Sequence, residues 1–260
     1  MYKVEKFVAL LEDYAPLSIS YKAIAKGDYD NSGLLIKSSD FVSKILFSLD
    51  LTKEAVNQAQ KIGADTIVTH HPAIYSPVKN MSIDGENAAL LSAIKLGMNV
   101  ISMHLNLDMA KCGIDQSLAE ALGAKDCKIL DDLDGEHGYG REFICEKAAV
   151  DIKTDAEKIL GTDKIILYGN GQIKSVASFC GGGSSHAQAL VEGGKTKADL
   201  IVTSDMPHHV LLSLISQKRA VMIIPHYVAE QYGFNKFFEW VKTKISDNAQ
   251  AEYFIDKRFM

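Results

Sequence analysis

The fold is decided by a short buried stretch that occurs twice, as Ala64-Asp-Thr-Ile-Val-Thr69 and as Ala198-Asp-Leu-Ile-Val-Thr203. The two copies match at five of six positions, and their β-branched and apolar residues are typical of buried strands. Patterns for further strands and helices alternate on both sides of each copy. Such alternation is typical of an α/β fold built on a parallel sheet, so the repeated stretch predicts two α/β lobes.

The patterns around the two copies give the expected elements. The sequence predicts strands at residues 44–50 and 99–104, a helix at residues 52–62, a strand at residues 220–224 and a long helix after it. Residues 123–150 lose this rhythm, and their acidic, glycine-rich centre indicates a boundary or a hairpin insertion.

We therefore expect two interlinked α/β lobes, at residues 1–124 and 125–260. Residues that could bind a metal occur in both halves, such as His70 and His71 in the first and His226 and Glu230 in the second, so we expect a metal-binding cleft between the lobes.

Composition excludes several classes of protein. The 260 residues are 47% hydrophobic and carry a net charge of −5, without a basic run, which argues against nucleic-acid binding. Charged residues interrupt the N-terminal apolar stretch, so we expect neither a signal peptide nor a membrane anchor. The four cysteines form no CxxC pair, which favours a reducing cytoplasm over a disulfide framework or a zinc ribbon.

Histidines cluster at the predicted strand ends. Six of the eight lie in four short windows, at His70, His71, His104, His208, His209 and His226. Ligands of open α/β sheets bind at the carboxyl ends of the strands. Three acids lie in or beside these windows, at Asp108, Asp205 and Glu230.

Imidazole and carboxylate donors without a thiolate suit Zn, Mn, Fe, Co or Ni and argue against a closed structural zinc site. There are enough donors for two ions, but the residues alone leave one ion or two open. A pair of ions typically lowers the pKa of a bound water and makes a hydroxide at neutral pH.

The glycine-rich segment at residues 181–185 is ambiguous. It follows a predicted strand and opens a predicted helix, where backbone N–H groups can hold an anion. It lacks the lysine of a P-loop and the spacing of a dinucleotide fingerprint, so a tight turn is the simpler interpretation.

Six motifs resemble, in order and over nearly the whole chain, the Nif-three-like family of dinuclear-metal-centre proteins, many of which are labelled GTP cyclohydrolase I type 2 homologue. They are Asp30-Asn-Ser-Gly-Leu-Leu35, Thr69-His-His-Pro72, His104-Leu-Asn-Leu-Asp108, Cys180-Gly-Gly182, Thr203-Ser-Asp205 followed by His208 and His209, and His226-Tyr-Val-Ala-Glu230.

The resemblance implies a ligand set for two divalent ions: His70, His71, Asp108, His226 and Glu230, with the aspartate as the bridge. It also implies that His104 lies close to the ions, as a further ligand or as a partner of a ligand, and that the chain forms a homohexamer. The chain departs from the family pattern at Ser204, Pro225 and Ala229, and none of these changes removes a ligand.

Two functions follow as expectations. The first is a metal-dependent hydrolase, in which a metal-bridging hydroxide attacks a nucleotide or phosphoester-like small molecule and His104 or His208 transfers protons. The alternative is a non-enzymatic metal-handling or regulatory assembly protein.

Overall fold

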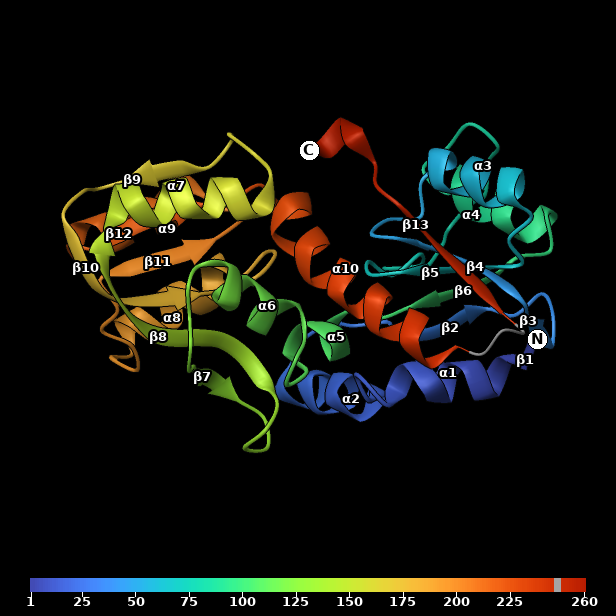
Figure 1. Cartoon of the computed structure of the whole chain (residues 1–260), viewed down its shortest axis with the longest axis horizontal. Helices are drawn as coiled ribbons and strands as arrows, with labels where there is room; N and C mark the ends of the chain where they lie inside the picture. Colours follow the sequence, from blue (N-terminus) through green and yellow to red (C-terminus); the bar gives the residue numbers. More distant parts are fainter. Residues whose placement is uncertain (246–248) are drawn as a thin grey trace. The chain divides into compact units, whose positions relative to one another are not determined.

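The computed structural model describes residues 1–245 and 249–260 and forms two compact units (Figure 1). Unit 1 comprises residues 1–107 and 234–258, and unit 2 comprises residues 108–233 and 259–260. Each unit contains its own mixed sheet with helices, which confirms the predicted α/β fold with two lobes. The predicted division after residue 124 cuts the chain once, whereas each unit is built from two separate stretches.

Unit 1 is built on a five-stranded sheet in the order β13-β4-β5-β6-β2. Its four strands β13, β4, β5 and β6 are parallel, and β2 is an antiparallel edge strand. The elements are β1 (Tyr2–Lys3), α1 (Val4–Glu12), α2 (Leu17–Lys26), β2 (Gly33–Ile36), β3 (Phe41–Val42), β4 (Lys44–Ser48), α3 (Lys53–Ile62), β5 (Thr66–Thr69), α4 (Ala88–Lys95), β6 (Asn99–Ser102), most of α5 (Leu105–Met109), the second part of α10 (His226–Lys244) and β13 (Gln250–Phe254).

Both faces of this sheet are covered. Neighbouring residues of a strand point to opposite faces, so Leu46 packs with residues of α3 and α4 while Phe47 packs against Phe234 and Phe237 of α10. Figure 1 shows α3 and α4 on one side of this sheet and α10 on the other. Leu46 and Phe47 are both fully buried for this reason. Thr52 caps α3 by accepting a hydrogen bond from the Ala55 N–H, as its position before the helix predicts.

Unit 2 is built on a six-stranded sheet in the order β7-β8-β10-β11-β12-β9. Strands β10, β11 and β12 are parallel, and the interruption at residues 123–150 is a hairpin of β7 and β8. The elements are α6 (Ile114–Ala121), β7 (Lys128–Asp132), β8 (Gly138–Ala148), α7 (Ala149–Leu160), β9 (Ile166–Tyr168), β10 (Gln172–Ser178), α8 (Ser184–Glu192), β11 (Leu200–Thr203), α9 (His208–Ser216), β12 (Ala220–Ile223) and the start of α10; η1 (Lys257–Phe259) ends the chain.

The repeated stretch has the same local structure in both units. Asp65 precedes β5 and accepts hydrogen bonds from the N–H groups of Ser43 and Lys44. Asp199 precedes β11 and accepts the matching bonds from the N–H groups of Lys174 and Ser175. The shared Ala-Asp pair therefore fastens the start of one central strand to its neighbour in each sheet.

A buried ion pair fastens α6 to β8 in unit 2. The Arg141 guanidinium is almost fully buried, lies 3.2 Å from the Asp115 carboxylate and also donates to the Gly138 carbonyl (2.8 Å) and to Gln116 (3.1 Å). Burial raises the pKa of Asp115 to about 6, although the charge of Arg141 pulls it down.

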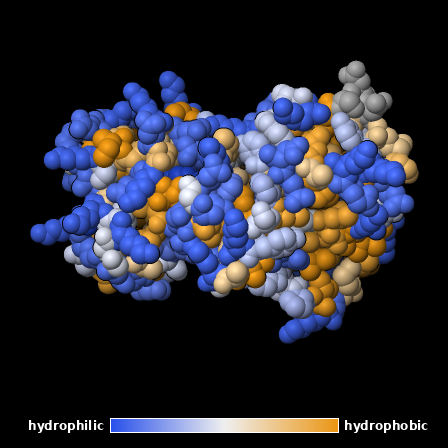
Figure 2. Space-filling model, turned by 90° about the horizontal axis from the view of Figure 1, so that it is seen from below, coloured by the Kyte–Doolittle hydropathy of each residue, from blue (hydrophilic) through white to orange (hydrophobic). Residues whose placement is uncertain are grey.

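None of the helices within the described residues is long and apolar enough to cross a membrane. Hydrophobic side chains do reach the surface, and Figure 2 shows a broad hydrophobic area over unit 1. Tyr21 and Ile24 of α2 are among the exposed side chains of this unit.

Candidate metal centre

Three histidines lie together where β5 and β6 of unit 1 end. The N–H groups of His70 and His71 both donate to the Leu49 carbonyl (3.1 and 3.0 Å), so the chain leaves the strand alternation directly after Thr69. The ring centroids lie 4.9 Å apart for His70 and His71 and 5.3 Å apart for His70 and His104. Two adjacent histidines therefore converge at a strand end, as the sequence predicts.

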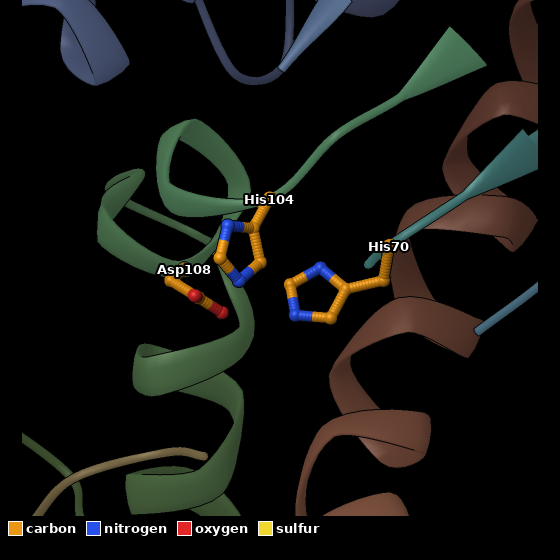
Figure 3. A group of neighbouring side chains, drawn as sticks. All are labelled: His70, His104 and Asp108. Carbon is orange, nitrogen blue, oxygen red and sulfur yellow. The ribbon is translucent and has the colours of Figure 1, made fainter. Parts of the chain in front are cut away.

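Asp108 joins this cluster through a short helix. His104 directly precedes α5, and Asp108 follows it by about one helical turn, so both side chains lie on one side of α5. Candidate donor atoms of His70, His104 and Asp108 lie within 4.8 Å of one another, and Figure 3 shows the two rings and the carboxylate turned toward a common point. Asn106 anchors α5 by donating to the Ala15 carbonyl (2.7 Å).

Hydrogen bonds orient each histidine of the candidate ligand set. In every case Nδ1 has an oxygen partner at 2.7 to 2.8 Å: the Met103 carbonyl for His70, Asp50 for His71, Asp30 for His104 and Asp205 for His226. A carbonyl or an ionised carboxylate accepts only, so Nδ1 carries a proton, and in the neutral ring Nε2 is the nitrogen left with a lone pair. Metal-binding histidines have this arrangement, in which an acceptor fixes the ring and leaves the other nitrogen for the ion.

Asp30 is the most deeply buried of these orienting carboxylates. One oxygen bonds His104 Nδ1, and the other accepts from the Ser32 hydroxyl (2.7 Å). Burial raises the pKa of Asp30, but hydrogen bonds from His104, Ser20 and Ser32 outweigh it and lower the pKa to about 2. The turn before β2 therefore supplies a partner for His104 that is ionised at neutral pH.

Unit 2 places a histidine and a glutamate one helical turn apart at the start of α10. His226 Nε2 lies 3.0 Å from Glu230 Oε1, and Glu230 is almost fully buried. Gly181 has a φ of +56°, and a Cβ atom there would overlap Glu230 Oε1. The glycine thus keeps open a space beside two candidate donors that any side chain would fill, and the residues present fit a bound ion.

Cys180 lies beside Asp108 without adding a thiolate. Its Sγ donates to Asp108 Oδ1 (3.4 Å), and its backbone N–H donates to Asp115 (3.1 Å). Burial and the neighbouring carboxylates raise the pKa of the Cys180 thiol well above its usual range. The donor set therefore remains nitrogen and oxygen, which is compatible with a divalent metal ion.

A family model described as Duf34/NIF3 (NGG1p interacting factor 3) matches residues 2–258. The chain belongs to the Duf34/NIF3 family. The family resemblance expected from the six motifs is thereby confirmed.

Relatives of this Duf34/NIF3 chain share one name. A Clostridium perfringens protein named GTP cyclohydrolase 1 type 2 homolog is 29% identical over 98% of this chain and 96% of its own length. A Staphylococcus aureus protein of the same name is 35% identical over 129 residues, which are 49% of this chain and 34% of that protein.

Solved structures share the Duf34/NIF3 fold. A crystal structure of a Staphylococcus aureus hypothetical protein has a TM-score of 0.84 at 24% identity and covers 98% of this chain and 96% of that chain. The reduced form of HcgD from Methanocaldococcus jannaschii has a TM-score of 0.81 at 24% identity, with 97% of each chain covered.

Some residues of the Duf34/NIF3 motifs are not themselves candidate metal ligands in the structure. His208 and His209 are exposed in the first turn of α9, and within the described residues neither belongs to a set of candidate metal ligands. Asp205, which the sequence offered as a ligand candidate, bonds His226 Nδ1.

Sequence reasoning missed Asp30 and Asp50 as orienting residues. Asp30 stands in a motif, which was a usable signal, whereas nothing in the residues around Asp50 marks it.

Proposed function

We propose that this Duf34/NIF3 protein binds two divalent metal ions and is a metal-dependent hydrolase of nucleotides or of phosphoester-like small molecules. The proposed ligands are His70, His71, Asp108, His226 and Glu230. The observation that carries the proposal is the fixed Nδ1 of each histidine, which presents Nε2 as a metal donor.

Asp108 is the proposed bridge between the two ions, and we propose that the two lobes close on this centre. The buried carboxylate of Asp108 beside His70 and His104 supports the first ion. For the second ion, His70, His71 and Glu230 form a further set of candidate ligands.

Bound divalent ions polarise a substrate and lower the pKa of water, which is the chemistry a hydrolase requires. The chain's own residues supply orientation and proton transfer. Asp30 and Asp205 hold His104 and His226 in one tautomer. His104 lies beside the ligands and is the proposed proton carrier, and His208 at the exposed start of α9 is a second candidate.

Further expectations belong to this proposal. The relatives' shared name, GTP cyclohydrolase 1 type 2 homolog, supports testing guanine nucleotides among the substrates. We also propose a homohexamer in a reducing cytoplasm; the four cysteines, Cys112, Cys127, Cys145 and Cys180, are free thiols.

Metal analysis is the first experiment. Protein loaded separately with Mn, Zn and Fe is expected to retain about two ions per chain, and Asp108→Ala is expected to retain fewer. Asp163→Ala, at an exposed aspartate, is the matched control and is expected to keep the wild-type content. An ion-free chain under all three conditions would overturn the proposal.

Turnover is the second experiment. The loaded protein is expected to hydrolyse at least one compound in a screen of nucleotides and phosphoesters, and the rate is expected to vanish in Asp108→Ala. If ions bind but turnover is absent, or survives in Asp108→Ala, a non-enzymatic metal-handling role replaces the hydrolase.

A further inference from the structure

Two half-exposed tyrosines lie beside the histidines of unit 1. Tyr29 is 52% exposed and Tyr75 is 53% exposed. Their ring centroids lie 5.0 Å apart in an edge-to-face arrangement, and the Tyr75 ring lies 6.2 Å from the His104 ring at an interplanar angle of 85°. An aromatic surface therefore adjoins one edge of the candidate metal centre.

The position of this pair is fixed by the segments that build the centre. Tyr29 directly precedes Asp30, the residue that orients His104. Tyr75 follows His71 by four residues, and its loop is tied down by Asn31, whose side-chain amide donates to the Ile74 carbonyl (2.7 Å). A molecule that rests on the two rings is therefore held at a defined distance from the ligands.

The two rings are also available to a third ring. An edge-to-face pair uses the face of one ring and the edge of the other, so ring faces remain for stacking. Within the described residues, neither the Tyr29 nor the Tyr75 hydroxyl has a hydrogen-bond partner, so no polar contact accounts for their half-exposed position.

A small cavity of about 240 Å³ adjoins Tyr75; it is lined by the loop from Pro72 to Val78 together with Glu86 and Asn87. Pockets that enclose a whole drug-sized ligand are larger, roughly 300–1,000 Å³, so this one suits only part of a molecule.

We propose that Tyr29 and Tyr75 form a stacking platform for a planar aromatic ring of the substrate, whose oxygen-bearing head group reaches the metal centre. This inference rests on the proposed function and narrows its substrate to compounds that join an aromatic ring to a metal-binding oxygen. Two aromatic side chains bury roughly 300–500 Å². A specific protein interface needs about 1,000 Å² or more, so a small molecule fits the pair better than a second protein does.

The test compares two non-hydrolysable ligands that differ only in the ring. Phenylphosphonate and methylphosphonate are titrated by calorimetry into the metal-loaded full chain. The wild type is expected to prefer phenylphosphonate by about three- to tenfold, the range that one aromatic pair contributes. The preference is expected to disappear in Tyr75→Leu and to fall in Tyr29→Leu, with the ion content unchanged.

Two control variants accompany the test. Tyr75→Phe keeps the ring and is expected to keep the preference, and Tyr21→Leu removes an exposed tyrosine of α2 and is expected to change nothing. If ions bind but the preference is absent, or survives in Tyr75→Leu, the platform is overturned while metal binding stands. If no ion binds, the proposed function fails and the platform with it.

Sedimentation velocity tests the other possible occupant, a second copy of the chain. The assembly is expected to be the same size in the wild type and in Tyr75→Leu. Dissociation in the variant would assign the tyrosines to an interface between copies and overturn the platform.

Discussion

The sheets of the two units repeat one arrangement of strands. In unit 1 the parallel strands β4, β5 and β6 are followed by the antiparallel edge strand β2, and in unit 2 the parallel strands β10, β11 and β12 are followed by the antiparallel edge strand β9. In both units this edge strand precedes the three parallel strands in the sequence and pairs with the last of them in the sheet. The two sheets therefore share one strand arrangement, in which β4, β5 and β6 of unit 1 correspond to β10, β11 and β12 of unit 2.

The residues at these strand ends differ. β5 is followed by His70 and His71, whereas β11 is followed by Ser204 and Asp205. His71 is oriented by Asp50 at the end of β4, and the strand register puts Gly181 at the matching position after β10. Unit 1 thus uses its strand ends for histidines, and unit 2 uses one of them for a carboxylate that orients a histidine. The same strand arrangement can therefore carry either candidate metal ligands or the carboxylates that orient them.

The ends of β6 in unit 1 and β12 in unit 2 show that the two sheets do not correspond residue by residue. The N–H of Met103 donates to the Thr69 carbonyl, and the N–H of Ile224 donates to the Thr203 carbonyl. Met103 and Ile224 therefore occupy equivalent positions, so Pro225 of unit 2 stands where unit 1 has His104. His226 comes one residue later, in the first turn of α10.

The largest expected effect is a loss of stability in unit 2, and it follows from how the two sheets are covered. Aromatic rings of α10 cover one face in unit 1, whereas a buried ion pair joins α6 to the sheet of unit 2. Arg141→Met is expected to lower the free energy of unfolding of unit 2 by about 3–5 kcal/mol, because it leaves the Asp115 carboxyl buried without its cation. Denaturant unfolding measures this loss.

The control for Arg141 is an exposed ion pair of the same unit. Lys147 lies 2.6 Å from Asp155, and both side chains are about half exposed. Lys147→Ala is expected to leave the free energy of unfolding nearly unchanged, because solvent screens an exposed pair. A loss below about 1 kcal/mol for Arg141→Met would show that the buried pair does not hold α6 in place.

The next effect compares the carboxylates that orient a histidine in each unit. The Asp30 side chain is 0% exposed, whereas that of Asp205 is 67% exposed. Loss of such a partner costs about 10–100-fold in metal affinity. His104 counts as a further ligand in this comparison, because it groups with His70 and Asp108. Asp30→Asn is then expected to lie near the upper end and Asp205→Asn near or below the lower end, because solvent screens the exposed carboxylate. Competition with a fluorescent chelator measures both affinities.

Equal losses in Asp30→Asn and Asp205→Asn would contradict the role given to burial. Asn is nearly the same size as Asp and keeps an oxygen, so neither variant opens a cavity. Circular dichroism before and after metal loading separates a folding defect from a weakened ligand.

The smallest effect is an acid dependence of unit 1. The folded pKa of Asp30, about 2, is lower than its ordinary value near 3.9, so ionised Asp30 stabilises the metal-free fold above about pH 4. This contribution, about 2 kcal/mol, is lost as the pH falls from about 4 to about 2. The unfolding free energy of the wild type is therefore expected to drop more steeply in this range than that of Asp30→Asn, and parallel curves would contradict the assignment.

Much of this architecture was predictable from patterns within single segments. Short continuous apolar runs located the strands, and glycines or Thr52 marked the helix ends. The convergence of His70 with His71 followed from their place at a strand end, and the spacing of His226 and Glu230 followed from the helical turn.

What escaped prediction depends on contacts between distant segments. The pairing of Asp30 with His104 joins residues 74 positions apart, and the antiparallel placement of β2 beside β6 brings the two together. The α2 helix was also missed. The helical form of residues Leu105–Met109 was left open, because a five-residue helix has too few turns to show a period.

Unit 1 contains both early and late parts of the chain, and this has a consequence for the order of synthesis. Phe47 packs against Phe234 and Phe237, and β4 pairs with β13. A ribosome delivers these partners only after it has made residues 108–233, nearly all of unit 2. Unit 1 is therefore completed only after nearly all of unit 2 has been made, and until residues 234–254 follow, its sheet remains without the edge strand β13 and without its aromatic cover.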